Sequence, residues 1–306
     1  MFERLDEIDW ASLNHAYGSA ADVPAMLRNM ASDVPDVRDN AFYEAYGNIF
    51  HQGTRYQASA PAIPFLLELL ADASYTSHAD VLLLIGNLVV GYSDAFVPFG
   101  TADHIAALRA DYAALSGRPD AERSEEQREE VQWLSWLIAI VDEARKGVPR
   151  YIRLLSSDDE MTRMCASYLL SLLPEDFELY EAALWDAVNN DASDTVRANA
   201  LVAFAIAASY DAFEEYVAEV EAMLEGGVPI VQFAAALALG TRTVDPPDEV
   251  IATLLAAIAG ESEDDEVEFE EDDFEEDDAE EDEVAHFGEH ADATITGEEE
   301  FPVADD

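Results

Sequence analysis

The residue types best suited to molecular recognition lie in two stretches, 51–60 (H-Q-G-T-R-Y-Q-A-S-A) and 92–102 (Y-S-D-A-F-V-P-F-G-T-A). Aromatic side chains and Arg are enriched at binding surfaces. We therefore predict binding residues in both stretches, namely His51, Gln52, Arg55, Tyr56, Tyr92, Asp94, Phe96 and Phe99. In the alternative interpretation, Phe96, Val97 and Phe99 cover a junction in the fold and His51 hydrogen-bonds a loop carbonyl.

Patterns for catalysis or metal binding are sparse. The chain has no G-x-S-x-G, phosphate-binding loop, H-E-x-x-H or C-x-x-C. Four histidines lie on different segments without ligand spacing and are predicted to be cap or loop residues: His15, His51, His78 and His104. His286 and His290 are spaced i, i+4 near carboxylates, which leaves a weak divalent-metal site as an alternative. We predict no enzymatic activity and no cofactor.

The charge of the chain is its most unusual property. Its 67 Asp and Glu against 15 Lys and Arg give a formal net charge of -52. Residues 261–306 hold 25 of these acids and no Lys or Arg, and residues 1–260 still carry 42 acids against 15 basic residues. Binding to phosphate backbones through counterion release needs Lys and Arg. We therefore predict no nucleic acid and no membrane as partner, and a basic protein as the best partner.

Cysteine usage and the N-terminus predict a cytoplasmic protein. Cys165 is the only cysteine and lies in an apolar helical pattern, so we predict a small core residue and no disulfide framework. The first ten residues, M-F-E-R-L-D-E-I-D-W, carry acids where a signal peptide needs basic residues. The longest apolar run, 81–90, is too short to span a bilayer.

The C-terminal segment 261–306 is predicted to be a disordered acidic tail. Between 261 and 283, 18 of 23 residues are acidic, and such a run repels itself and stays extended. Its charge spacing of roughly 4.3 Å is close to the about 3.4 Å of one DNA strand. The tail is therefore suited to mimic a polyanion, with Phe269, Phe274 and Phe287 as apolar anchors for a basic partner. Alternatively, it only makes the chain soluble.

One helical unit recurs along residues 1–260. In the stretch 191–208 (D-A-S-D-T-V-R-A-N-A-L-V-A-F-A-I-A-A), Asp194 is the predicted N-cap of a helix that is apolar on nearly all sides. Such a helix has to be buried between other helices. Similar helices carry a polar marker residue near their start, at Gln132, Arg163, Arg197 and Gln232. Successive markers lie 31, 34 and 35 residues apart.

A period of this length with two helices is typical of an α-solenoid. We predict an all-α fold, an α-solenoid of about six antiparallel helix pairs, over an irregular helical bundle as the alternative. A short helix over 8–17 is expected to cover the first repeat. The predicted units are a domain 1–260, with repeats near 19–50, 61–91, 103–144, 148–173, 177–208 and 212–240 and a capping helix 247–259, and the tail 261–306.

The start of the second helix in several repeats resembles HEAT-repeat proteins of the type similar to phycobilin lyases. The resembling segments are D-T-V-R from Asp194, D-E-M-T-R from Asp159 and D-V-R from Asp36, each followed by a run rich in Ala and Leu or other apolar residues, with Pro near the start of several first helices. The chain departs from this pattern at Gln132 and Gln232, where Arg is expected. The resemblance implies an armadillo-like, right-handed superhelix whose second helices line a concave side.

The concave side is the usual binding surface of a solenoid. We predict binding residues on the second helices, at Tyr43, Glu44, Asn87, Tyr168, Asn199 and Gln232. Arg38, Arg163 and Arg197 are expected instead to pair with Asp residues of the inter-helix turns, in a ladder that repeats along the stack.

Three hypotheses follow for the function. The preferred one is a monomeric, non-enzymatic scaffold or adaptor for a basic protein, with an immunity or inhibitor protein that masks a basic toxin nuclease as a special case. The second is a small-molecule-binding protein like the phycobilin lyases, with a ligand in the concave groove or between the two long loops. In the third, the acidity reflects a habitat with high internal salt.

Overall fold

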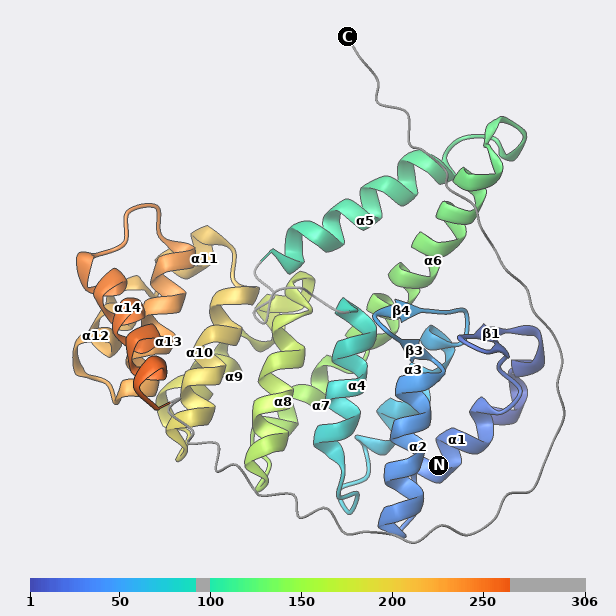
Figure 1. Cartoon of the computed structure of the whole chain (residues 1–306), viewed down its shortest axis with the longest axis horizontal. Coiled ribbons are helices and arrows are strands. Elements are labelled where there is room, and N and C mark those ends of the chain that lie inside the picture. The colour runs from blue at the N-terminus through green and yellow to red at the C-terminus, as the bar shows by residue number, and fades with distance from the viewer. Residues whose placement is uncertain (92–99, 265–306) are drawn as a thin grey trace, which may run out of the picture. The chain divides into compact units, whose positions relative to one another are not determined.

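The computed structural model describes residues 1–91 and 100–264. The chain divides into two units, 1–263 and 264–306, and only the first is described below. The fold of the described residues is all-α, as predicted, with fourteen α-helices and two short antiparallel hairpins (Figure 1). The predicted tail lies outside the described residues from 265 onward.

The helices are α1 Val23–Met30, α2 Pro35–Gly47, α3 Ser59–Leu69, α4 His78–Val90, α5 Thr101–Ser116, α6 Glu125–Arg145, α7 Val148–Leu154, α8 Glu160–Ser171, α9 Phe177–Asn190, α10 Asp194–Ala207, α11 Tyr210–Glu214, α12 Val217–Gly226, α13 Pro229–Arg242 and α14 Asp248–Asp264. The strands are β1 Asn14–His15, β2 Gly18–Ser19, β3 Phe50–His51 and β4 Thr54–Arg55. Short 3-10 turns span Leu5–Glu7, Trp10–Ser12, Asp120–Glu122 and Pro174–Asp176.

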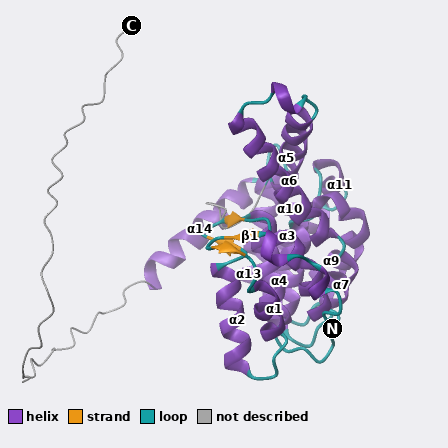
Figure 2. Cartoon of the chain, turned by 90° about the vertical axis from the view of Figure 1, so that its right-hand side faces the viewer, coloured by secondary structure: helices purple, strands orange, loops and turns teal. Residues whose placement is uncertain are grey.

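Five helices, α2, α4, α8, α10 and α13, form one layer that we call the second-helix row. Within it, α4 packs on α8, α8 on α10 and α10 on α13. The partner helices α7, α9 and α12 pack behind the row, against α8, α10 and α13 respectively. Figure 1 shows the row side by side, and in Figure 2 α13 and α2 lie on one side with α7 and α9 on the other. The helix pairs therefore follow one another in file.

The sequence of α10 explains why the row forms. Val196, Leu201 and Phe204 are buried on different sides of this helix, and so are most of its alanines. Three helices, α8, α9 and α13, enclose it. The N-cap is Ser193, whose hydroxyl accepts the Val196 N–H, and Asp194, the predicted cap, is the first helical residue. A helix of this composition is stable only between neighbours.

The pair α5–α6, predicted as the repeat 103–144, is present as an antiparallel pair but stands outside the row. Helix α4 packs directly on α8, and α6 packs on α3 and α4 through its C-terminal half. The outer part of the pair has a small separate core of Leu108, Leu134 and Leu137. Because the first two turns of α6 are polar on all sides, they cannot lie between two apolar helices. Figures 1 and 2 both show this end of the pair standing away from the row.

The helix predicted over 8–17 is wrong. This segment contains the 3-10 turn Trp10–Ser12 and the hairpin β1–β2. The Trp10 indole donates to the Leu5 carbonyl over 2.8 Å and its ring packs on Phe65. Tertiary contacts of Trp10 therefore outweigh the weak local helical pattern. At the other end, the predicted capping helix is α14, whose Val250 and Leu254 lie against Gly240 of α13.

The predicted ladder of Arg with Asp of the inter-helix turns forms at Arg163, while Arg197 pairs with Asp194 inside α10. Arg163 binds Asp191 of the next inter-helix turn through Nε and Nη2, at 2.7 and 3.1 Å. Arg197 pairs with Asp194 at 2.9 Å. Arg38 instead donates to the Ser32 carbonyl, and its Nε, which lies 4.0 Å from Asp39 of the same helix, has no hydrogen-bond partner among the described residues.

The Arg163–Asp191 pair predicts a pH-dependent contribution to stability. Burial alone would raise the pKa of Asp191, but hydrogen bonds from Arg163 and the Ser193 N–H outweigh it and hold that pKa below its ordinary value. The contribution is therefore complete above the unfolded-state pKa of about 3.9 and is lost as pH falls through the lower folded-state pKa. At pH 7, we expect D191N to lower the free energy of unfolding by about 1–3 kcal/mol.

The measurement is urea unfolding, followed by circular dichroism, of wild type and D191N between pH 7 and pH 2. The difference between the two chains isolates Asp191 from the general relief of charge repulsion at low pH. The exposed neighbour Asp158 provides the control D158N, which should change stability by less than about 0.5 kcal/mol. A wild-type advantage that stays constant down to pH 2 would contradict the assignment.

Candidate binding surface

The predicted stretch 51–60 forms the hairpin β3–β4, which lies against the hairpin β1–β2. The Asn14 carbonyl accepts the Ala58 N–H at 3.2 Å, and the Asn48 carbonyl accepts the Ala16 N–H at 3.1 Å. The Tyr17 and His51 rings meet edge to face, with their centroids 5.5 Å apart. We call the two hairpins together the hairpin rim. Tyr17 is 71% exposed there and was not predicted, although H-A-Y-G-S and H-Q-G-T are similar turn sequences.

The structure places the predicted rim residues differently from one another. Gln52 is exposed at the tip of the turn with a φ of +48°, and His51 and Tyr56 are half-buried. Tyr92, Phe96 and Phe99 lie outside the described residues, as does Asp94. The predicted contact between the two stretches therefore stays a prediction.

Arg55 points into the protein, so its prediction as a surface residue is wrong. It is 8% exposed, and its Nη1 donates to the Gly53 carbonyl at 2.8 Å. Its Nε has no hydrogen-bond partner among the described residues. Burial lowers the pKa of Arg55 to about 10. Gly91 allows this placement, because a Cβ on Gly91 would lie 1.8 Å from Nη1.

Two histidines of the described residues, His15 and His78, hydrogen-bond structural partners. His15 Nδ1 accepts the Tyr17 N–H at 3.0 Å, so Nε2 carries the proton and donates to Asp22 at 2.9 Å. With both nitrogens occupied, His15 has no free lone pair for a general base. His78 Nε2 lies 3.0 Å from the Asp72 carbonyl. His286 and His290 lie outside the described residues.

Two other sources of chemistry give no reactive group. Cys165 is buried, and burial raises its pKa to about 11, which disfavours the nucleophilic thiolate. In residues 1–91 and 100–264, no group of three or more His, Cys, Asp or Glu is arranged to hold a metal ion. Among the same residues, no helix is both long enough and apolar enough to cross a membrane.

The second-helix row presents one residue pattern to solvent. Each helix of the row has one reference residue: Arg38, Leu82, Arg163, Arg197 or Gln232. The residue two positions before it, the residue one position after it and the residue five positions after it lie on the same face of that helix. We call these fifteen positions the outer stripe. They are Asp36, Asp39 and Tyr43 on α2, Asp80, Leu83 and Asn87 on α4, Met161, Met164 and Tyr168 on α8, Thr195, Ala198 and Val202 on α10, and Ile230, Phe233 and Leu237 on α13. All but Ala198 are exposed or half-buried.

Three of the predicted concave residues also join neighbouring helices of the row. Asn199 donates to the Met164 carbonyl and to Ser167 Oγ, at 3.0 and 2.6 Å, so it links α10 to α8. Asn87 donates to the Tyr46 hydroxyl at 3.1 Å and links α4 to α2. Tyr168 packs over Gly86, where a Cβ would come within 3.3 Å of its ring. Tyr43 is 81% exposed and stays available for binding.

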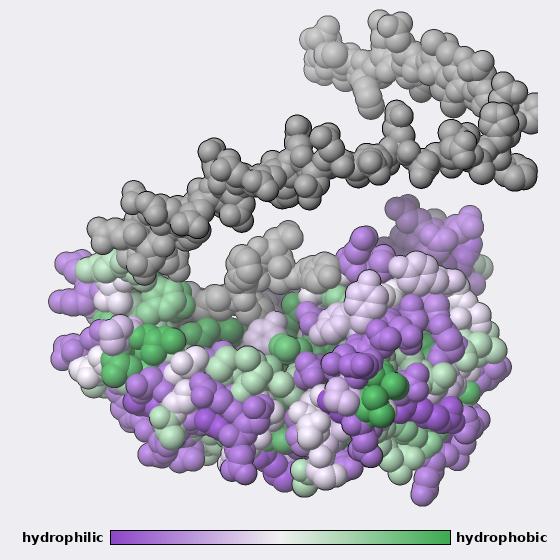
Figure 3. Space-filling view, turned by 60° about the horizontal axis from the view of Figure 1, so that its bottom comes forward, coloured by the Kyte–Doolittle hydropathy of each residue, from purple (hydrophilic) through white to green (hydrophobic). Residues whose placement is uncertain are grey.

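The outer stripe changes in chemistry from one end of the row to the other. The α2 and α4 end carries Asp36, Asp39 and Asp80, all exposed. On α8 and α13 the exposed members are Met161, Ile230 and Phe233. In Figure 3, hydrophilic residues dominate the side of the inter-helix turns, and apolar residues gather most closely at the left, where Figure 1 has α13 and α14.

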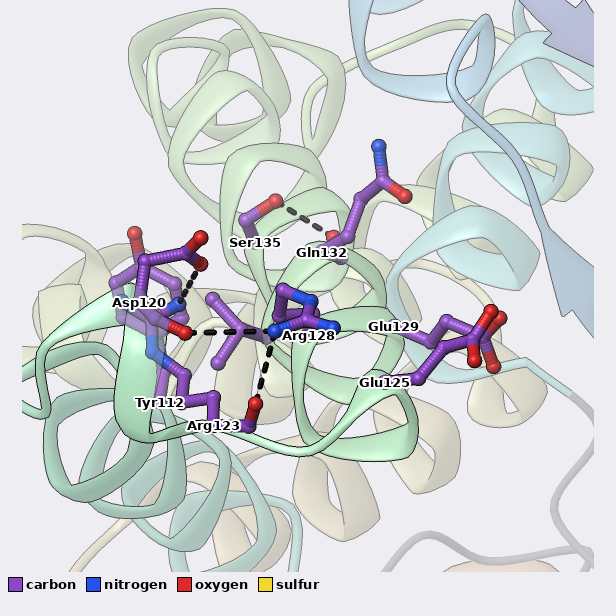
Figure 4. Close-up of a pocket in the computed structure, with 9 residues that line it drawn as sticks. Tyr112, Asp120, Arg123, Glu125, Arg128, Glu129, Gln132 and Ser135 are labelled. Atoms are coloured by element: carbon purple, nitrogen blue, oxygen red, sulfur yellow. Dashed lines mark hydrogen bonds and ion pairs between the residues drawn. The ribbon is translucent and has the colours of Figure 1, made fainter.

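The described residues include two pockets outside the stripe. The first, at the tip of α5–α6, is lined by Arg123 and Arg128, whose guanidinium groups are bound to backbone carbonyls of the turn (Figure 4). It is therefore explained as part of that turn. The second, of about 870 Å³, lies between the starts of α5, α9 and α11, with Tyr210 and several carboxylates in its lining. Arg242, also in this lining, donates to the Ala205 and Ile206 carbonyls at the end of α10.

Neither a scan against protein-family models nor a search of curated proteins returned a match to this chain. The likeness to HEAT repeats therefore remains a prediction from the residues quoted above. The structure adds a row of helices with an exposed stripe that is acidic at one end and apolar at the other.

The contact between Arg55 and Gly91 predicts a severe effect of G91A. Gly91 has a φ of +76°, a conformation that costs other residues about 1–3 kcal/mol, and the new Cβ would also displace Arg55. We expect the free energy of unfolding to fall by at least about 2 kcal/mol, measured by urea unfolding. The matched control is G226A, since a Cβ at Gly226 meets no atom within 4 Å. Equal stability of G91A and G226A would contradict the described packing.

Proposed function

We propose that the chain is a non-enzymatic scaffold or adaptor that binds a basic protein. The observation that supports this is that most Lys and Arg side chains are bound within the chain, while acidic residues are in large excess. Residues 1–260 carry 42 acids and 15 basic residues, and most of the basic ones are bound within the chain. Ion pairs hold Arg4, Arg28, Arg38, Arg109, Arg123, Arg145, Lys146, Arg163 and Arg197.

Other cations donate hydrogen bonds to backbone carbonyl groups. Arg55, Arg128 and Arg242 all donate to backbone oxygens. The carboxylates exceed the cations by 27 in residues 1–260, so the surface stays negative even where cations pair with carboxylates. A surface of this kind attracts cationic proteins, accelerates their association and repels nucleic acid and anionic membranes.

The exposed stripe supplies the second requirement for a scaffold, a contact area with apolar anchors. Carboxylates raise the association rate of a basic partner and attract it in a salt-sensitive way. Apolar side chains that become buried in the interface lower the dissociation rate of the complex. Both are present on one face of the row. An immunity or inhibitor protein that covers a basic toxin nuclease is a special case of the same proposal. We further propose a cytoplasmic monomer.

A small-molecule function is the second candidate, and the 870 Å³ cavity favours it. Its size lies in the range of ligand pockets, and it combines Tyr210 and Phe177 with Asp103 and Glu178. With biliverdin as the probe, this function predicts a rise of the melting temperature and a coloured complex. A colourless protein with an unchanged melting temperature would remove it.

The scaffold function predicts binding that depends steeply on salt. The full chain is immobilised and titrated with lysozyme and cytochrome c as basic probes and with serum albumin as the acidic control. Because the Debye length falls from about 10 Å at 0.1 M to about 3 Å at 1 M salt, the affinity for the basic probes should weaken at least about tenfold between 0.05 and 0.5 M NaCl. Absence of binding at low salt, or binding that salt leaves unchanged, would contradict the proposal.

A further inference from the structure

The outer stripe has an acidic end at which three carboxylates meet one cation, Arg38. Among residues 1–91 and 100–264, Asp36 and Asp80 form no ion pair, and Asp39 forms only a long one, at 4.0 Å, with Arg38. Three cations of the second-helix row, Arg38, Arg163 and Arg197, are held by carbonyls or carboxylates at the inter-helix turns. A ligand that covers the α2 and α4 end therefore meets a negative surface.

The other end of the stripe has anchors without charge. Met161, Met164 and Tyr168 lie on α8, and Ile230 and Phe233 lie on α13. Met side chains adapt to differently shaped apolar partners. Between them, α10 contributes the small Ala198 and Thr195 and the half-buried Val202, so nothing bulky or charged separates the two groups of anchors.

The spacing of the row matches the repeat of an α-helix. Packed helices lie about 8–10 Å apart, so five of them extend over about 32–40 Å. Two residues seven positions apart in an α-helix are separated by about 10.5 Å along its axis and lie on nearly the same side. A helix laid across the row can thus place one side chain on each successive second helix.

We propose that the outer stripe binds an amphipathic helix of the basic partner, with its Lys- and Arg-rich end over α2 and α4 and its apolar end over α8, α10 and α13. This inference rests on the proposed function and adds the surface and the orientation. Charge complementarity selects this occupant over two others. The segment 265–306 of this chain is strongly acidic, and a second copy would bring further carboxylates to the acidic end. Both would be repelled there.

The test uses a synthetic helical peptide of about 30 residues, about 45 Å long, which holds five positions seven residues apart. It carries Leu at every seventh position, with Lys beside these positions in one half and apolar residues beside them in the other. Its binding to the full chain is followed by fluorescence anisotropy between 0.05 and 0.5 M NaCl. Circular dichroism and melting curves verify that each variant is folded.

Two variants separate the two ends of the stripe. D36N/D39N/D80N should weaken binding about five- to tenfold at 0.05 M NaCl and have little effect at 0.5 M, because it removes screened charge attraction. I230S/F233S should weaken binding at least about tenfold at both salt concentrations, because it removes apolar anchors. A second peptide, with Lys beside the Leu positions in both halves, should bind with less sensitivity to I230S/F233S than the first.

The matched control is E125Q/E126Q/E129Q, which removes three exposed charges from the outer end of α6. It should leave peptide binding within about twofold of wild type. If it weakens binding as much as D36N/D39N/D80N, or if I230S/F233S has no effect, the stripe is not the site, although the chain still binds basic ligands. If neither the peptide nor the basic proteins bind at low salt, the proposed function itself fails.

Discussion

The constraint on which this structure depends is the burial of helices that have almost no polar side. Apart from Asn199, the middle of α10 is apolar in every direction, and α8, α9 and α13 cover it. A helix of that kind cannot end a protein or face solvent broadly, so each one requires a neighbour on both flanks. Repetition of this requirement, from α4 to α13, produces a row rather than a cluster around one centre.

The row also decides where polar groups go. Because the flanks are used for packing, charged residues are left to the inter-helix turns and to the one face that remains open. Residues of the turns bind cations, as Asp191 binds Arg163. The open face is left with Asp36, Asp39 and Asp80 at one end and apolar residues at the other. The surface chemistry proposed for binding is thus a by-product of how the core is built.

Most helices could be predicted from the sequence, because a pattern of apolar residues with a 3.6-residue period depends only on the helix itself. The position of α5–α6 could not. Both helices of this pair were predicted correctly. Their place beside the row follows from the direct packing of α4 on α8, which is a tertiary contact. The segment 8–17 was misassigned for a similar reason, since Trp10 obtains its hydrogen bond and its packing from tertiary contacts.

The candidate site shows the same division. Exposure of Tyr43 and the pairing of Arg163 follow from position within a repeated unit, and both could be predicted. Arg55 looks like a surface residue in sequence, yet its direction is set by Gly91, 36 residues away. Asn199 is polar but is used to join α10 to α8. Partners distant in the chain decide such cases, and a single sequence does not reveal them.

The direct packing of α4 on α8 is the central claim, and cross-linking tests it. In a C165S chain, L83C and M164C place thiols at equivalent positions of the two helices, about 8–10 Å apart if the helices are neighbours. A bis-maleimide of about that length should join them within one chain, whereas L83C with L179C, on α9 behind the row, should stay unlinked. Efficient linking of the second pair and none of the first would show that the helices do not stand in a row.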